Sequence, residues 1–155
     1  QVCGVSLGIK WVNDLYLKEK KVCGILTEAV TDFETGDIEF VVVGIGLNLY
    51  PPEGGFPEYL EHVAGTVLKP GQGIDRNRLA GEIVNRLLEE AEKPGIPREY
   101  VERNIVPGRK VKISYGNRER VVKAEKIRRD GRLEILNEKG EREVLPCGDV
   151  SLFFS

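Results

Sequence analysis

Short apolar runs separated by polar turns make up most of this chain, and this pattern favours a fold rich in β-strands. The longest run, 40–47, reads Phe-Val-Val-Val-Gly-Ile-Gly-Leu and falls far short of the roughly 20 residues that cross a bilayer. We interpret it as a single strand. Because 40–45 is apolar on both faces, we predict a central strand that is covered on both sides.

The first third of the chain predicts three β segments: Gly8–Leu17, Lys21–Ala29 and Asp37–Asn48. Polar turns at 18–20 and 31–36 connect them. Connections this short favour an antiparallel meander, since parallel strands need a longer crossover. The proline- and glycine-rich residues that follow these strands are typical of a loop.

A helix is predicted after Asp75, which is a good N-cap residue. Apolar residues recur behind it at helical spacing and form one stripe, which consists of Leu79, Ala80, Ile83, Val84, Leu87 and Leu88. Pro94-Gly95 should end this helix. One more short helical turn is expected at Arg98–Asn104.

From Pro107 onward the pattern changes to short strand candidates separated by glycine turns. The strands are Val111–Ser114, Val121–Ile127, Leu133–Leu136, Val144–Leu145 and Val150–Phe153, and the turns contain Gly116-Asn117, Asp130-Gly131 and Lys139-Gly140. Five short strands with tight turns predict a small SH3-like β-barrel. The predicted fold class is therefore α+β, with a first domain at 1–104 and the barrel at 105–155.

Composition and charge exclude several classes of protein. The 155 residues include 23 Lys and Arg against 25 Asp and Glu, a net charge of −2, and 41% are hydrophobic. This balance is typical of a folded, soluble protein and argues against a nucleic-acid arm or a membrane-binding basic patch. One basic cluster occurs, but the interleaved Glu119 and Glu125 favour a solvated strand face. The cluster consists of Arg118, Arg120, Lys123, Lys126, Arg128 and Arg129.

The three cysteines, Cys3, Cys23 and Cys147, cannot all pair, and their wide spacing matches no zinc motif. We therefore expect a reduced, cytoplasmic protein. The only histidine, His62, has no visible catalytic partner. The sequence contains no Met, and its start at 1–4 resembles neither a signal peptide nor a natural beginning, so we expect a fragment.

Three groups of residues could carry chemistry, and each also has a structural explanation. Residues 44–48 lack the third glycine and the following helix of a dinucleotide-binding motif, and a glycine-bearing strand bend explains them better. The lysines in 18–21 are typical of a solvated turn, although Lys21 opens an apolar strand and could neutralise a carboxylate or phosphate. Asn13 and Asp14 fit either an Asx-turn or a position beside Mg²⁺ and phosphates.

Taken together, three segments resemble the biotin–protein ligases. Lys10-Trp11-Val12-Asn13-Asp14 is similar to the family's Lys-Trp-Pro-Asn-Asp strand, with Val12 at a structural position that the family fills with proline. Residues 21–28 match its Lys-x-x-Gly-Ile-Leu-x-Glu strand, and 44–48 match its Gly-Ile-Gly-x-Asn strand. The helix start at 75–79 and the Gly-Asp-Val-Ser at 148–151 match as well, so the resemblance covers nearly the whole chain.

This resemblance implies a two-step ligase reaction. ATP and biotin give biotinyl-5′-adenylate and pyrophosphate, and a lysine of a biotin carboxyl carrier protein then attacks the mixed anhydride. The implied catalytic residue is Lys21, which contacts the biotin carboxylate and later the adenylate oxygens. Mg²⁺ assists the triphosphate, with Asp14 as its candidate ligand. The other implied biotin- and adenylate-binding residues are Lys10, Trp11, Asn13, Asp14, Gly24, Ile25, Leu26, Gly44, Gly46 and Asn48.

The family's Gly-Arg-Gly-Arg-x-x-Arg loop, which orders over biotin, lies upstream of the Lys10 strand and is absent from this sequence. We therefore expect the chain alone to be a weak or inactive ligase. The alternative is a non-catalytic module that binds a carrier protein or a partner ligase half. Lipoate ligases share the fold but match this combination of motifs and barrel less well. An uncovered sheet edge predicts association with an upstream half or as a homodimer.

Overall fold

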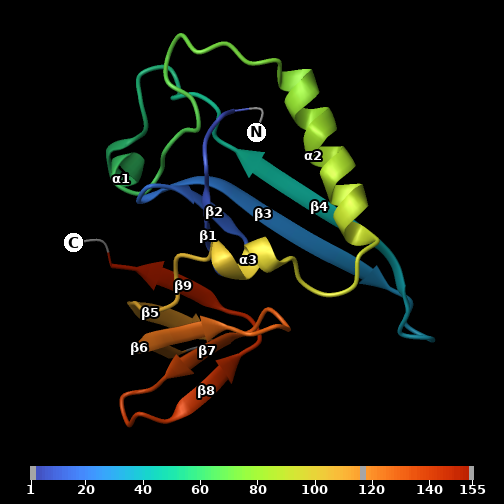
Figure 1. The fold of residues 1–155 in the computed structure, drawn as a ribbon, viewed down its shortest axis with the longest axis vertical. Coiled ribbons are helices and arrows are strands. Elements are labelled where there is room, and N and C mark those ends of the chain that lie inside the picture. The colour runs from blue at the N-terminus through green and yellow to red at the C-terminus, as the bar shows by residue number, and fades with distance from the viewer. Residues whose placement is uncertain (1–2, 116–117, 154–155) are drawn as a thin grey trace.

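The computed structural model describes residues 3–115 and 118–153 and contains two antiparallel sheets connected by helices (Figure 1). The first sheet has the order β1-β2-β3-β4, which follows the chain. Its strands are β1 (Gly8–Lys10), β2 (Asp14–Leu17), β3 (Lys20–Thr31) and β4 (Ile38–Leu47). Each neighbouring pair is antiparallel, so the predicted meander is confirmed.

The prediction of one unbroken strand over Gly8–Leu17 is wrong. A turn at 11–13 divides it into β1 and β2, which pair with each other. Trp11, whose peptide bond to Val12 is cis, lies in this turn. Its side chain is 1% exposed and packs with the second sheet, where the indole N–H donates to the Gly131 carbonyl at 2.7 Å. The turn lets Trp11 leave the first sheet.

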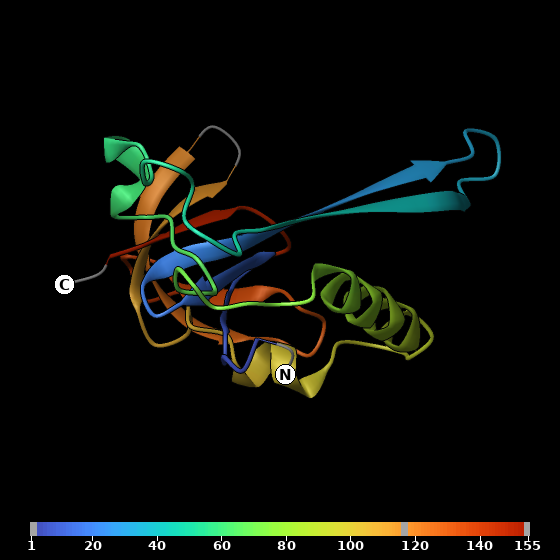
Figure 2. The ribbon, with the colours of Figure 1, turned by 90° about the horizontal axis from the view of Figure 1, so that it is seen from above.

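The prediction that the third β segment is central and covered is also wrong. In the described residues β4 is an edge strand that pairs with β3 alone. Phe40, Val41 and Val42 are each about half exposed. The outer parts of β3 and β4 form a hairpin that projects beyond the rest of the molecule, so neither helices nor loops cover it (Figure 2). An apolar run indicates that its side chains favour burial, but it does not show which part of the molecule buries them.

The helices are α1 (Glu58–Glu61), α2 (Arg76–Ala91) and α3 (Arg98–Glu102). Asp75 caps α2, since its carboxylate accepts a hydrogen bond from the Arg78 N–H at 3.0 Å. The predicted cap, the helix that follows it and the short turn over 98–104 are therefore confirmed. In Figure 1, α2 lies alongside β3 and β4 and α3 lies between the two sheets. Among the described helices, none has the length and apolar character needed to cross a membrane.

The second sheet contains all five predicted strands within a few residues of the expected bounds. They are β5 (Lys110–Tyr115), β6 (Arg118–Ile127), β7 (Leu133–Leu136), β8 (Arg142–Leu145) and β9 (Asp149–Leu152). The strand order is β8-β7-β6-β5-β9. No pairing of β8 with β9 closes it in the part of the chain that the structure describes, so the structure shows a five-stranded antiparallel sheet and the predicted SH3-like barrel is not confirmed. The predicted turn at Gly116-Asn117 lies outside the described residues.

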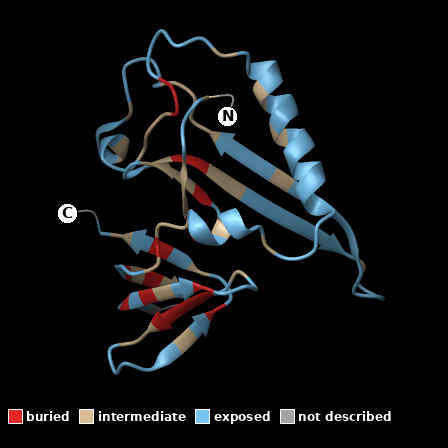
Figure 3. Ribbon diagram, viewed as in Figure 1, coloured by how far each residue is buried: buried red, intermediate tan, exposed pale blue. Residues whose placement is uncertain are grey.

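Most of the buried core belongs to the second sheet (Figure 3). Its buried cluster consists of Trp11, Val106, Val111, Ile113, Val122, Ala124, Ile127, Leu133, Ile135, Leu145 and Val150. The first sheet has a smaller buried cluster of Val22, Val67 and Leu68. Backbone hydrogen bonds join β1 to the segment between α3 and β5, because the Ile9 N–H donates to the Arg103 carbonyl at 2.9 Å and the Ile9 carbonyl accepts from the Ile105 N–H at 2.8 Å. The predicted boundary at residue 105 falls in this junction and stays a prediction.

Candidate functional site

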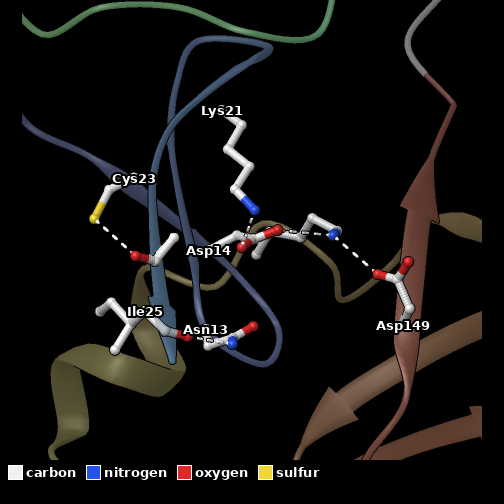
Figure 4. Close-up of polar contacts among 8 residues, drawn as sticks. Asn13, Asp14, Lys21, Cys23, Ile25 and Asp149 are labelled. Carbon is white, nitrogen blue, oxygen red and sulfur yellow. Dashed lines mark hydrogen bonds and ion pairs between the residues drawn. The ribbon is translucent and has the colours of Figure 1, made fainter. Parts of the chain in front are cut away.

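Asp14 is a buried carboxylate at the start of β2, and two lysines share it. In the sheet register it lies opposite Lys10 of β1 and Gly24 of β3. Its Oδ2 atom lies 3.1 Å from the Lys10 Nζ atom, and its Oδ1 atom lies 2.6 Å from the Lys21 Nζ atom (Figure 4). Each carboxylate oxygen therefore holds one ammonium group.

A β-bulge brings Lys21 to this carboxylate. In a regular strand, Lys21 and Gly24 would point to opposite faces, since side chains alternate with a period of two. The register shift between Leu15 and Tyr16 pairs Tyr16 with Lys21 and Asp14 with Gly24. The bulge therefore puts the Lys21 side chain on the same face as Gly24 and Asp14.

Gly24 provides the space that Lys21 crosses. A Cβ atom at position 24 would lie 3.2 Å from both Cε and Nζ of Lys21 and 3.6 Å from Oδ1 of Asp14. A larger residue would therefore push the lysine away from the carboxylate. The Lys21 side chain remains 44% exposed, so its ammonium group is accessible to an anion from solvent.

A cavity of about 210 Å³ lies beside Lys21. Its walls come from β2, β3, the end of β4 and the segment around α1, and they consist of Tyr16, Lys21, Cys23, Gly24, Gly46, Asn48, Leu60, Val63 and Ala64. The α1 wall is fixed to β3, since the Lys21 N–H donates to the Val63 carbonyl and the Gly65 N–H donates to the Lys21 carbonyl, both at 2.8 Å. One ammonium group among mainly apolar walls suits a ligand with an anionic end and an apolar body.

Four of the predicted site residues line this cavity: Lys21, Gly24, Gly46 and Asn48. Asp14 reaches it through its ion pair with Lys21. The Asn48 side-chain amide donates to the Gly65 carbonyl at 3.1 Å, which holds the end of β4 against the segment that follows α1. Residues from three predicted motifs therefore meet at one place.

Two predicted residues point toward the second sheet instead. Trp11 lies in the core of that sheet, so its position gives it a packing role. Lys10 is 7% exposed and bridges Asp14 and Asp149, the latter at 3.4 Å. Burial disfavours the charged form of Lys10, but the hydrogen bond that Lys10 donates to Asp14 and the charges of Asp14, Tyr16 and Asp149 outweigh burial and raise the pKa of Lys10.

The remaining predicted residues lie along the sheet, outside the cavity. The Asn13 side-chain amide donates to the Ile25 carbonyl, and the Ile25 N–H donates to the Asn13 carbonyl at 2.9 Å, so Asn13 fixes the turn to β3. Ile25 lines a larger groove next to α2. Leu26 is 59% exposed, and Gly44 lies opposite it in β4.

Sequence reasoning missed several walls of the cavity. Tyr16 was detectable, because it follows Asp14 by two residues on one strand and therefore shares its face. Cys23 lies inside a recognised motif, between Lys21 and Gly24. The apolar wall of Leu60, Val63 and Ala64 gave no signal, since its place depends on pairing with β3 across 40 residues of chain.

Neither Tyr16 nor Cys23 offers a charged nucleophile or base in the cavity. Burial raises the pKa of the Tyr16 hydroxyl and of the Cys23 thiol, although the nearby Lys21 charge lowers each of them in part. Both groups therefore stay protonated near neutral pH. Since a thiol reacts as its thiolate, Cys23 serves as a wall rather than as a nucleophile.

The residues around Asp14 do not fit a protein-bound magnesium site. Both carboxylate oxygens are already paired with ammonium groups. In the described residues there is no group of three or more His, Cys, Asp or Glu side chains that could hold a metal ion. Mg²⁺ in proteins prefers several oxygen ligands and often binds through substrate phosphates. The predicted role of Asp14 as a metal ligand therefore has no support in this donor set.

A second, larger hollow of about 890 Å³ lies between the first sheet and α2. Its apolar walls include Ile25 and Ile45 from the sheet and Leu79, Ile83 and Leu87 from the helix. Charged residues of α2 also border it: Arg78, Glu82, Arg86 and Glu90. We call this hollow the α2 groove. Much of the apolar stripe of α2 faces it, and Leu87 is 41% exposed.

Comparison with known proteins identifies relatives of this chain. Residues 2–48 match the model of the biotin/lipoate A/B protein ligase family. The chain is 31% identical to the bifunctional ligase/repressor BirA of Escherichia coli, and the match covers 93% of this chain and 46% of that protein. It is 32% identical to the biotin–[acetyl-CoA-carboxylase] ligase of Mycobacterium tuberculosis, with 92% and 52% covered.

The fold matches a solved ligase over nearly the whole chain. The apo biotin protein ligase from Aquifex aeolicus superposes with a TM-score of 0.75 and 25% identity, covering 99% of this chain and 68% of that one. The same enzyme in complex with biotin and ATP gives a TM-score of 0.72, with 24% identity and 65% of that chain covered. The chain is thus similar to bacterial biotin protein ligases, and it spans about half the length of the curated proteins that it matches.

Proposed function

We propose that this chain is the second half of the catalytic region of a biotin–protein ligase together with its C-terminal sheet, and that Lys21 is its catalytic lysine. The observation that carries the proposal is the Lys21–Asp14 pair on the rim of a mainly apolar cavity. The relation to biotin protein ligases over 92–93% of the chain supports it. The substrates proposed are biotin and ATP, and the acceptor is a lysine of a biotin carboxyl carrier protein in the cytoplasm.

The geometry suits a reaction that depends on charge neutralisation. The carboxylate of biotin is an anion on an apolar body, which matches an ammonium group above apolar walls. Lys21 Nζ lies 2.6 Å from Asp14 Oδ1, so the carboxylate of an incoming ligand can take the place of Asp14 beside Lys21. The Lys21 ammonium group then keeps an anionic partner throughout. As negative charge develops on the reacting oxygens, a lysine already held in place stabilises it without reorganisation.

The rest of the proposed site follows the cavity. Gly24 leaves the surface low enough for a ligand to lie on β3, and Gly46 and Asn48 border the place where an adenylate would extend. Asn13 keeps the Asp14 turn fixed to β3 through its bond to the Ile25 carbonyl. Magnesium enters this proposal only with the nucleotide, because residues 3–115 and 118–153 contain no dedicated ligand set.

A second candidate function is a binding module that joins a partner half or a second copy without catalysing a reaction. The observation that favours it is the uncovered apolar surface of the first sheet, including Phe40, Val42 and the α2 groove. Surfaces of this kind are typical of association sites. The two candidates are compatible, because a split ligase needs such an interface before it can react.

The test measures the mass of a purified apo carrier domain after incubation with the chain, biotin, ATP and Mg²⁺. The chain is tested alone and together with a second chain, the part of a related ligase that precedes the region matched here. We expect one biotinyl addition in the two-chain mixture. Lys21→Ala should lower the rate at least about 100-fold, in the range seen when a charge-stabilising group is removed from an active site.

The matched control is Lys69→Ala, which removes an exposed lysine away from the cavity and should leave the rate unchanged. A Lys21→Ala variant as fast as the parent chain would contradict the role of Lys21. Absence of product from both mixtures, with the chain nevertheless bound to the upstream part, would contradict the ligase proposal and favour the binding module.

A further inference from the structure

Lys10 connects the cavity to the second sheet, although it is outside the cavity itself. Its ammonium group lies 3.1 Å from Oδ2 of Asp14 and 3.4 Å from Oδ1 of Asp149. Asp149 is the first residue of β9, so its carboxylate comes from the far end of the chain (Figure 4). Together with Lys21, these residues form a row of alternating charge: Asp149, Lys10, Asp14, Lys21.

The two lysines in this row have different surroundings. The Lys10 side chain is 9% exposed, whereas that of Lys21 is 44% exposed. A buried ammonium group needs paired anions, since burial without them costs several kcal/mol. Lys10 therefore stays bound to carboxylates, and Lys21 is the lysine that is free to exchange Asp14 for a ligand.

In this arrangement each carboxylate oxygen of Asp14 pairs with a different lysine. Oδ2 is held by Lys10, while Oδ1 holds Lys21. When Lys21 turns to an anionic ligand, Lys10 still neutralises Asp14, so the carboxylate stays in place. If Lys10 lost its second anion, it would depend on Asp14 alone and compete with Lys21 for the same carboxylate.

We propose that Asp149 is a positioning residue for the cavity. It holds the Lys10 ammonium group at Oδ2 of Asp14. Oδ1 of Asp14 then stays in place for Lys21, which can leave it to pair with an anionic ligand and return. The part of this inference that concerns catalysis rests on the proposed role of Lys21. Asp149 touches neither the cavity nor Lys21, and therefore acts through Lys10 and Asp14. The second sheet thereby supplies a charge, the Asp149 carboxylate, that helps to position the Lys10–Asp14–Lys21 group in the first sheet.

A purely structural role for Asp149 would require that its removal lowers the stability of the fold, and the positioning role predicts otherwise. The Asp149 side chain is 76% exposed, and Lys10 keeps its shorter ion pair with Asp14 when Asp149 is lost, so the contribution of the Lys10–Asp149 pair to stability should be roughly 0–1 kcal/mol. Removing the Asp149 charge should therefore leave the unfolding midpoint almost unchanged. What should change is the protonation of Lys10 and the binding of an anion at Lys21.

The first measurement is the titration of the lysine Cε and Nζ resonances by NMR, on the full chain and its Asp149→Asn variant. The groups that face Lys10 are Asp14 and Tyr16 of β2 and Asp149 of β9. Loss of the Asp149 charge should lower the pKa of Lys10, since one of its two carboxylates is gone. Glu138→Gln, an exposed carboxylate change elsewhere in the second sheet, should not. An unchanged Lys10 titration in Asp149→Asn would overturn the inference.

The second measurement is steady-state biotinylation by the two-chain mixture. Asp149→Asn should raise the KM for biotin about 3- to 10-fold with an unchanged unfolding midpoint, and Asp149→Glu should restore it. Lys10→Met should have the larger effect, and Asp149→Asn should add nothing to it, because both changes break the same contact. Additive effects, or a fall in the unfolding midpoint parallel to the loss of activity, would overturn the positioning role.

The two measurements separate failure of this inference from failure of the proposed function. If the parent mixture makes no biotinylated carrier but the Lys10 pKa still falls in Asp149→Asn, the proposed function fails and the positioning of Lys10 by Asp149 stands. If the parent mixture is active and Asp149→Asn changes neither the Lys10 pKa nor the KM for biotin, the proposed function stands and the inference fails.

Discussion

The two sheets bury their apolar residues to different extents, although both are built from antiparallel neighbours. The second sheet surrounds a continuous buried cluster to which β5, β6, β7, β8 and β9 all contribute. The first sheet buries Val22, Val67 and Leu68 and leaves Phe40, Val41 and Val42 about half exposed (Figure 3). Its free edge strand and the α2 groove belong to the same uncovered region.

This difference shows where stability and chemistry reside in the chain. The second sheet has the close-packed interior that gives a small domain its stability. The first sheet carries the cavity and the exchangeable lysine but little interior of its own. Trp11 connects them, since it belongs to the first sheet by sequence and to the second by packing.

Trp11→Ala should have the largest effect on stability. It removes a side chain that is 1% exposed and a hydrogen bond to Gly131, so we expect a loss of about 3–5 kcal/mol in the free energy of unfolding, measured by urea denaturation. Tyr59→Ala removes an aromatic ring that is 79% exposed and should cost less than about 0.5 kcal/mol. Equal costs for the two variants would mean that the sheets do not depend on Trp11.

A pair of isoleucine variants tests the difference between the sheets directly. Ile135→Ala in β7 empties a fully buried position and should cost about 2–5 kcal/mol. Ile45→Ala in β4 changes a side chain that is 40% exposed and should cost below about 1 kcal/mol. Denaturation at several protein concentrations serves as the control. A cost for Ile45→Ala that rises with concentration would show that association covers the first sheet in solution.

The smallest expected effect concerns the outer face of the second sheet. Hydrogen bonds from Arg120 and Asn137 lower the pKa of Glu143 below its usual 4.5. The native state then binds fewer protons than the unfolded state, so this stabilisation is present above about pH 4.5 and is lost as the pH falls through the lowered native value. Because the pair is largely solvated, its coupling should stay below about 1 kcal/mol.

The measurement compares the urea midpoints of the parent chain and Glu143→Gln at pH 7 and pH 3. The difference between the two proteins should shrink at the lower pH, because the unfolded parent chain then binds a proton at Glu143 that the native carboxylate resists. A difference that stays constant across this range would contradict the role assigned to the Glu143 charge.

Patterns within one element were enough to predict most strands, the cap at Asp75 and the helix behind it. Pattern and resemblance together selected Lys21 and Asp14, which the structure places 2.6 Å apart. Both successes depend on information that is local in the sequence. A period of two or of 3.6 is visible in a short window, and so is a capping residue such as Asp75.

The failures have the opposite origin. The turn at 11–13 exists because Trp11 finds its neighbours in strands about 100 residues later, which no local pattern contains. The exposure of β4 was not predictable either, because an apolar run does not show whether another segment of the same chain packs against it. The α1 wall of the cavity depends on backbone hydrogen bonds of Lys21 with Val63 and Gly65. Every residue except proline has the same backbone groups, so the sequence does not show which residues pair in this way.

Lys10 and Trp11 are adjacent in the chain, yet their side chains take partners from two different places in the second sheet: Asp149 at the start of β9 and Gly131 in the turn between β6 and β7. Contacts of these two side chains therefore cross the predicted boundary at residue 105. A shortened chain that ends there would leave an indole in water and a buried ammonium group with one anion fewer. Any dissection of this protein into modules has to keep the last strand with the first turn.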